Sequence, residues 1–174
     1  MKLLNYLRGS KFVSSDNFTQ KIQRKLSIKV VNKELYKEAF THSSANLKNS
    51  NGQTINFERL EFLGDALLTS IVAEFLFEYY PYANEGELTK FRAKIVSRSK
   101  LNEIGKLMRL IELAKISIQH KNFGEDIHGN LLEALIGAVL IDRGHKKCSY
   151  FILNKILEDY VDTCLLYTSD AADE

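Results

Sequence analysis

The sequence predicts one all-α domain, and three features carry this prediction. The 174 residues include one proline and nine glycines, so little interrupts long helices. Apolar residues recur at helical spacing, and the alternation typical of strands is missing. The composition is 45% hydrophobic and 26% charged, which excludes disordered, collagen-like and disulfide-scaffold proteins. A chain of this length can bury one core.

The first half of the chain predicts two helices after a basic N-terminal extension, residues 1–29. A short helix runs from Leu35 to Phe40. A loop rich in Ser and Asn follows from Thr41 to Thr54. A long helix then extends from Asn56 to Tyr80, where Pro81 ends it because proline cannot continue a helical hydrogen-bond ladder.

The second half predicts three further helices. Asn84 and Glu87 have the spacing of a capping box, which begins a helix that continues to about Met108. After a polar loop, an apolar helix runs from Asn130 to Ile141. The last helix spans roughly Lys146 to Asp162.

The last eleven residues, 164–174, do not continue this helical pattern. Their sequence, CLLYTSDAADE, resembles the translation of a transposase-type sequencing adapter. We therefore assign the domain to residues 30–163 and leave the tail out of the fold. We expect the natural protein to continue beyond Thr163.

The net charge of +2 hides an uneven distribution. Residues 1–50 carry ten basic and three acidic groups, and residues 81–130 carry nine and six. Residues 51–80 carry one basic and five acidic groups, and residues 131–174 carry four and eight. The acidic surplus thus coincides with the two most hydrophobic stretches, whereas carboxylates normally lie on solvated faces.

The sequence favours a cytoplasmic protein without membrane attachment. Its two cysteines, Cys148 and Cys164, form neither a disulfide framework nor a metal-ligand spacing, which favours a reducing compartment. No run reaches the roughly 18 apolar residues of a membrane span, and the N-terminal residues lack a secretion signal.

The long helix carries acids on a face that is otherwise apolar. At 100° per residue, Glu58, Glu61 and Asp65 share an arc of about 60°. Leu68 and Leu76 occupy the same arc further along. The helix is apolar on most of its other faces, so we expect it to be central and its acids to lie at a functional position.

The predicted apolar helix from Asn130 to Ile141 contains an acid in a still more apolar setting. Glu133 is the only polar side chain in residues 131–141, and an ionised carboxylate buried there is unfavourable unless it is paired or bound to a metal. Asn130 adds an amide oxygen on nearly the same face. If the two helices face each other, these two residues converge with Glu61 and Asp65.

Oxygen ligands without cysteine or histidine favour Mg²⁺, with Mn²⁺ as a possible substitute. Such a site suits metal-assisted hydrolysis of a phosphodiester. The alternative is a set of buried salt bridges, for example between Glu133 and Arg92 or Lys94.

Four motifs in the same order resemble those of ribonuclease III endonucleases, which cleave double-stranded RNA. The longest is the acidic stretch of residues 57–68, FERLEFLGDALL. Its companions are residues 39–44 (AFTHSS), residues 85–90 (EGELTK) and residues 132–138 (LEALIGA), the last followed by Asp142 and Gly144. Together they cover about residues 30–160.

The resemblance implies an all-helical endonuclease domain that acts as a homodimer and depends on Mg²⁺. Glu61, Asp65 and Glu133 match the family's metal-binding and catalytic acids. Asn130 stands where most members have aspartate, so a fourth ligand would bring an amide oxygen without its charge. Further matches are two secondary acids, Glu58 and Glu85, and an aromatic residue that lodges in the partner subunit, Phe62.

The resemblance also implies the products and the biological role. These are 5′-phosphate and 3′-hydroxyl ends with a short 3′ overhang, in the processing of rRNA and mRNA. A double-stranded-RNA-binding domain usually follows the nuclease domain. The alternatives are a catalytically weakened or inactive RNA-binding dimer of the same fold and a helical interaction module whose acids form salt bridges.

Basic residues of the predicted helix after Pro81 are candidates for contacts with RNA phosphates. Lys90, Lys94 and Arg98 recur every four residues, with Arg92 nearby. A solvated basic face is the alternative. By contrast, the apolar surroundings of His42 indicate a structural, hydrogen-bonded histidine.

Overall fold

The computed structural model describes residues 17–117, 124 and 126–158 and confirms the all-α prediction. The described residues contain no β-strand, only two isolated bridges, Thr41 with Lys115 and Lys48 with Thr54. The described residues divide at residue 30 into two compact units, and helix α1 (Asn17–Leu26) belongs to the first. The predicted adapter-like tail lies outside the described residues.

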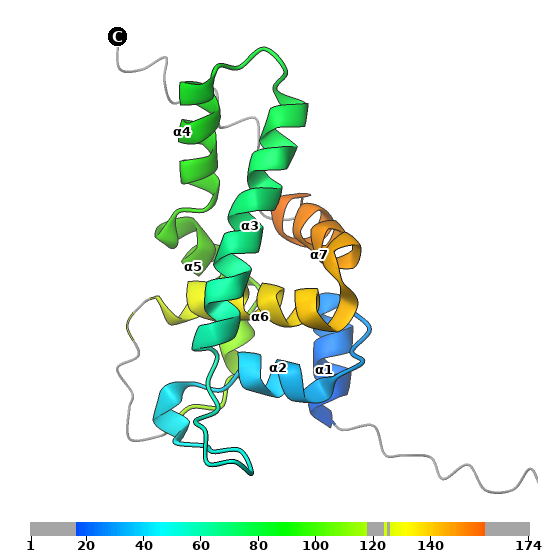
Figure 1. The fold of residues 1–174 in the computed structure, drawn as a ribbon, viewed down its shortest axis with the longest axis vertical. Helices are drawn as coiled ribbons and strands as arrows, with labels where there is room; N and C mark the ends of the chain where they lie inside the picture. The colour runs from blue at the N-terminus through cyan, green and yellow to red at the C-terminus, as the bar shows by residue number, and fades with distance from the viewer. Residues whose placement is uncertain (1–16, 118–123, 125, 159–174) are drawn as a thin grey trace, which may run out of the picture. The chain divides into compact units, whose positions relative to one another are not determined.

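The second unit carries the remaining helices, which Figure 1 labels, and it also contains all the candidate site residues. Its α-helices are α2 (Lys33–Ala39), α3 (Glu58–Tyr79), α4 (Glu85–Ile95), α5 (Arg98–Leu107), α6 (Ile127–Arg143) and α7 (His145–Ile152). Short 3₁₀ turns cover Ser43–Ala45 and Leu110–Leu113, and a π-helical turn, Leu153–Leu157, extends α7.

The prediction of one helix from Asn84 to Met108 is wrong, because the chain breaks it into α4 and α5. The capping box that begins α4 is confirmed: Asn84 accepts a hydrogen bond from the Glu87 amide at 3.0 Å, and Glu87 accepts one from the Asn84 amide at 2.7 Å. A second cap follows at Ser97, whose hydroxyl oxygen accepts from the Lys100 amide at 3.3 Å and begins α5.

The crossing of α3 and α6 is the central contact of the fold. An added Cβ on Gly64 would overlap the backbone carbonyl oxygen of Glu133, and one on Gly137 would overlap that of Leu60. The two helices therefore approach backbone to backbone, which only glycine permits at these two positions. This crossing sets how near the acids of α3 come to the acid of α6.

Helix α6 is the buried helix that its apolar sequence predicts. Its fully buried side chains include Leu131, Leu132, Leu135 and Ile136, and helices α2, α3, α5 and α7 all pack against it. Its first turn starts earlier than predicted, at Ile127. No side chain from Ile127 to Leu140 is exposed, so a carboxylate among them must face a partner or a pocket.

Two polar residues, Asp142 and His42, connect the segments around this core. Asp142 at the end of α6 accepts hydrogen bonds from the Val31 and Asn32 amides at 3.0 and 2.7 Å and from the Tyr36 hydroxyl at 3.0 Å. Burial and the Asp142 charge raise the pKa of Tyr36 far above its usual value. The structural assignment of His42 is confirmed, since its Nδ1 accepts from the Ser44 amide at 3.1 Å.

The predicted last helix, Lys146 to Asp162, begins at His145, and its end lies outside the described residues. No helix in the described part of the chain is long and apolar enough to cross a membrane.

Candidate active site

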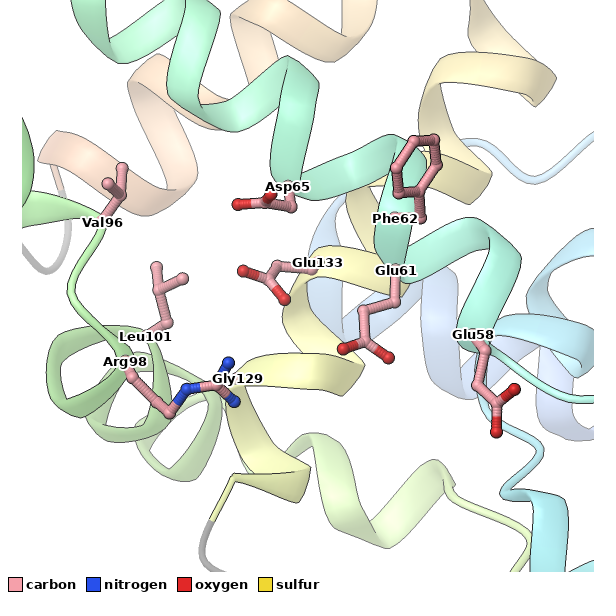
Figure 2. A pocket seen from close by; sticks show the side chains of 9 residues that line it. All are labelled: Glu58, Glu61, Phe62, Asp65, Val96, Arg98, Leu101, Gly129 and Glu133. Atoms are coloured by element: carbon pink, nitrogen blue, oxygen red, sulfur yellow. The ribbon is translucent and has the colours of Figure 1, made fainter.

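A pocket of about 530 Å³ opens between α3, the start of α5 and the first half of α6. Figure 2 shows the nine side chains that line it. They are Glu58, Glu61, Phe62, Asp65, Val96, Arg98, Leu101, Gly129 and Glu133.

The three principal acids reach this pocket from two helices. Glu61 and Asp65 lie one turn apart on α3, on either side of Gly64 in the sequence. Glu133 belongs to α6, and its backbone packs directly against Gly64. Figure 2 shows all three carboxylates directed into the same space. The closeness of the two backbones at Gly64 therefore brings Glu133 opposite the acids of α3.

Two of these acids, Glu61 and Glu133, have a raised pKa in the pocket. Burial, followed by the charges of Asp65 and Glu61, raises the pKa of Glu133 to about 7. Burial also raises the pKa of Glu61, and the Glu58 and Asp65 charges add to that rise. Arg98 opposes the rise in both cases. A divalent cation in the pocket would favour the ionised forms.

The salt-bridge alternative finds no support. Among residues 17–117 and 126–158, no Lys or Arg forms an ion pair with Glu133. Arg92, one of its proposed partners, instead lines a separate groove between α3 and α4. Glu133 is thus a half-buried acid whose nearest electrostatic partners are mainly other acids.

The donor chemistry of the pocket fits a hard divalent ion, although its side chains do not stand in a coordination shell. No three Asp, Glu, His or Cys side chains in the described part of the chain are close enough together to hold one ion. Coordination therefore requires the carboxylates to rotate inward. The donors are all oxygen, and the mutual repulsion of the acids is the force that a bound cation would relieve.

Two other predicted acid-site residues lie apart from this pocket. Asn130 is half-buried in the first turn of α6 and is not one of the lining residues. Glu85 begins α4 and lines the α3–α4 groove with Phe77 and Arg92. Within one chain, the structure thus brings Glu58, Glu61, Asp65 and Glu133 together and leaves Asn130 and Glu85 outside.

Phe62 projects outward from α3 and is 79% exposed, so it does not belong to the core of the chain. Its ring lies at the rim of the pocket (Figure 2). An aromatic side chain with this exposure is available for a contact with another molecule.

The predicted basic stripe is divided between two helices. Lys90 and Lys94 are exposed on α4, whereas Arg98 is the first residue of α5 and lines the acidic pocket. The sequence reasoning missed this position of Arg98 because it treated residues 84–108 as one helix. Ser97, a good N-cap residue, is the local signal that marks the break.

Comparison with known proteins assigns the family. Residues 32–160 match the family model described as ribonuclease-III-like. The chain belongs to the ribonuclease III family. It is 45% identical over 162 residues to ribonuclease 3 of Zunongwangia profunda, a match that covers 93% of this chain and 67% of the relative. It is 47% identical over 145 residues to ribonuclease 3 of Flavobacterium psychrophilum, with 83% of this chain and 59% of the relative covered. The chain thus spans about two thirds or less of these ribonuclease III relatives.

Among solved structures, the chain is similar to a nuclease domain of ribonuclease III. The nuclease domain from Campylobacter jejuni is 32% identical and superposes with a TM-score of 0.72, covering 81% of this chain and 97% of that one. The description of that structure refers to a region involved in dimer formation. The helical ribonuclease III fold predicted from the sequence is therefore confirmed.

Proposed function

We propose that this chain is the nuclease domain of an endoribonuclease that hydrolyses phosphodiester bonds in both strands of double-stranded RNA. The single observation that supports it most is Glu133, a half-buried acid that faces Glu61 and Asp65 across the α3–α6 crossing. Membership of the ribonuclease III family supports the same reaction. The expected products are 5′-phosphate and 3′-hydroxyl ends with a short 3′ overhang. The expected setting is rRNA and mRNA processing in the cytoplasm.

Glu61, Asp65 and Glu133 would hold the Mg²⁺, or Mn²⁺ in its place. When bound, such an ion supplies activation of water and neutralisation of phosphate charge. The three carboxylates would fix its position relative to the substrate. The Asn130 amide would contribute only if it turned toward the pocket from the first turn of α6.

The residues that surround these acids define how RNA would approach. Val96 and Leu101 contribute apolar side chains to the wall of the pocket. Lys90 and Lys94 would contact RNA phosphates from the exposed side of α4, and Arg98 would do so from the pocket itself. Arg92 lies half-buried in the α3–α4 groove, so it contributes only if RNA reaches that groove.

The cleavage assay uses duplex RNA with the purified chain, either with Mg²⁺ or with EDTA. Mg²⁺-dependent cleavage of the duplex but not of single-stranded RNA of the same sequence is expected. A catalytically inactive RNA-binding dimer would instead shift the duplex in a gel without cutting it. A helical interaction module would neither bind nor cut.

A homodimer is the second part of the proposal, and Phe62 is its main contact. Phe62, Ala66, Ala73 and Phe77 follow one another at intervals of four, seven and four residues on α3, so they share one face. Phe62 and Phe77 are 79% and 72% exposed. Small residues between two exposed aromatics suit close packing against a second copy of the chain.

Replacing Phe62 with alanine is expected to shift the chain from dimer to monomer, weakening association by at least about tenfold, because an interface aromatic is a typical hot spot. Sedimentation equilibrium over a range of concentrations measures the change. Tyr150→Ala on α7 is the matched control, since Tyr150 is 67% exposed on another helix. Equal association of the Phe62→Ala variant and the unmodified chain would remove Phe62 from the interface.

A further inference from the structure

Arg98 is the only cationic side chain among the described residues that line the acidic pocket. Its guanidinium points toward the pocket near Gly129 (Figure 2). Burial raises the pKa of both Glu61 and Glu133, and the charge of Arg98 opposes that rise in each case. Arg98 therefore acts electrostatically on the acids of both helices although it forms an ion pair with neither.

Arg98 forms its ion pair with Asp126, which is not one of the residues that line the pocket. Its Nη1 is 3.2 Å from Asp126 Oδ2. The second oxygen of Asp126 accepts a hydrogen bond from the Asn102 side-chain amide at 3.1 Å, and the Asn102 oxygen accepts one from the Gly129 amide at 2.7 Å. Asn102 is only 8% exposed, so Asp126 is connected to the core through Asn102, while the Arg98 and Asp126 side chains are 68% and 50% exposed.

The pair has a consequence for an ion in the pocket. A guanidinium forms strong bidentate pairs with a free carboxylate, and the arginine side chain is long and flexible. Without Asp126, we expect Arg98 to fold onto Glu133 or Glu61 and occupy the space between them. The anchored Asp126 instead keeps the guanidinium at the edge of the pocket.

We propose that Asp126 restrains Arg98 at the pocket edge, where its charge partly neutralises the acids without occupying the place of a divalent ion. This inference rests on the proposed metal site and assigns to it a pair of residues that set its affinity for the ion. Arg98 lowers the affinity through repulsion of the cation, and Asp126 limits that effect by holding Arg98 away.

The two residues therefore have opposite effects on metal affinity. Titration of the 174-residue chain with MnCl₂, followed by the electron paramagnetic resonance signal of free Mn²⁺, measures this affinity without RNA or turnover. Arg98→Gln is expected to bind Mn²⁺ roughly fivefold more tightly, because a nearby positive charge is gone. Asp126→Asn is expected to bind about threefold more weakly, because Arg98 then pairs with the pocket acids. Arg98→Lys retains the charge, so its Mn²⁺ affinity should stay within about twofold of that of the unmodified chain.

The double variant separates restraint of Arg98 from a general effect of the Asp126 charge. If Asp126 acts through Arg98, the Mn²⁺ affinity of the double variant Arg98→Gln/Asp126→Asn should match that of Arg98→Gln within about twofold. The inference would be overturned if Asp126→Asn lowered the Mn²⁺ affinity equally in the unmodified chain and in the Arg98→Gln variant. An unchanged Mn²⁺ affinity of Arg98→Gln would also overturn it. Lys106→Gln on α5 is the charge-matched control and should bind as the unmodified chain does. Absence of Mn²⁺ binding by the unmodified chain would overturn the metal site and this inference together.

Discussion

Replacing Glu133 with glutamine is expected to reduce Mg²⁺-dependent cleavage of duplex RNA by roughly a thousandfold or more. Glutamine has nearly the same shape but cannot supply the negative charge that the proposed ion needs opposite Glu61 and Asp65. Such a loss corresponds to about 4 kcal/mol of transition-state stabilisation. Single-turnover cleavage of a duplex at saturating Mg²⁺ measures it. Retained turnover would remove Glu133 from the site.

The same substitution should stabilise the ion-free chain above neutral pH. The pKa of Glu133 is raised to about 7, chiefly by burial, so its contribution to stability is full below about pH 4.5 and is lost as the pH rises through 7. Glutamine has no proton to lose. At pH 8 in EDTA, we expect the free energy of unfolding of the Glu133→Gln variant to exceed that of the unmodified chain by about 2 kcal/mol. The difference should be smaller at pH 5.

Urea unfolding at the two pH values checks this second effect. The combination of greater stability and lost activity distinguishes an active-site acid from a structural one. A buried salt bridge predicts the opposite sign, because removing one member leaves the other charge unpaired.

Replacing Gly64 with alanine is expected to destabilise the fold by about 3 kcal/mol. The added methyl group would overlap the backbone carbonyl oxygen of Glu133, so α3 and α6 would have to move apart. The separation would also take Glu133 away from the acids of α3, so cleavage should fall even where the variant is folded. Urea unfolding gives the free energy, and cleavage at low temperature gives the effect on the site.

Gly124→Ala is the matched control for this experiment, because a Cβ there has no neighbour within 4 Å. It should unfold at the same urea concentration as the unmodified chain. If Gly64→Ala also leaves the midpoint unchanged, the close crossing of α3 and α6 does not determine the stability of the domain.

The sequence by itself determined the features that depend on neighbouring residues. Pro81 ends the long helix, and Asn84 with Glu87 begins the next, because capping and proline geometry act over three or four residues. The isolated acid in α6 was equally visible, since a carboxylate in an apolar helix conflicts with burial wherever that helix packs. The all-α class followed from these local signals, whereas the resemblance to ribonuclease III rested on the four ordered motifs.

Only the tertiary structure decided which side chains meet. Gly64 lies against the backbone of Glu133, and this contact between distant segments sets the spacing of the acids. The pairing of Arg98 with Asp126 likewise joins residues far apart in the chain, and it depends on a helix break that the basic periodicity concealed. Helical spacing specifies the direction of a side chain from its own axis, whereas the distance between two helices depends on how closely their backbones pack.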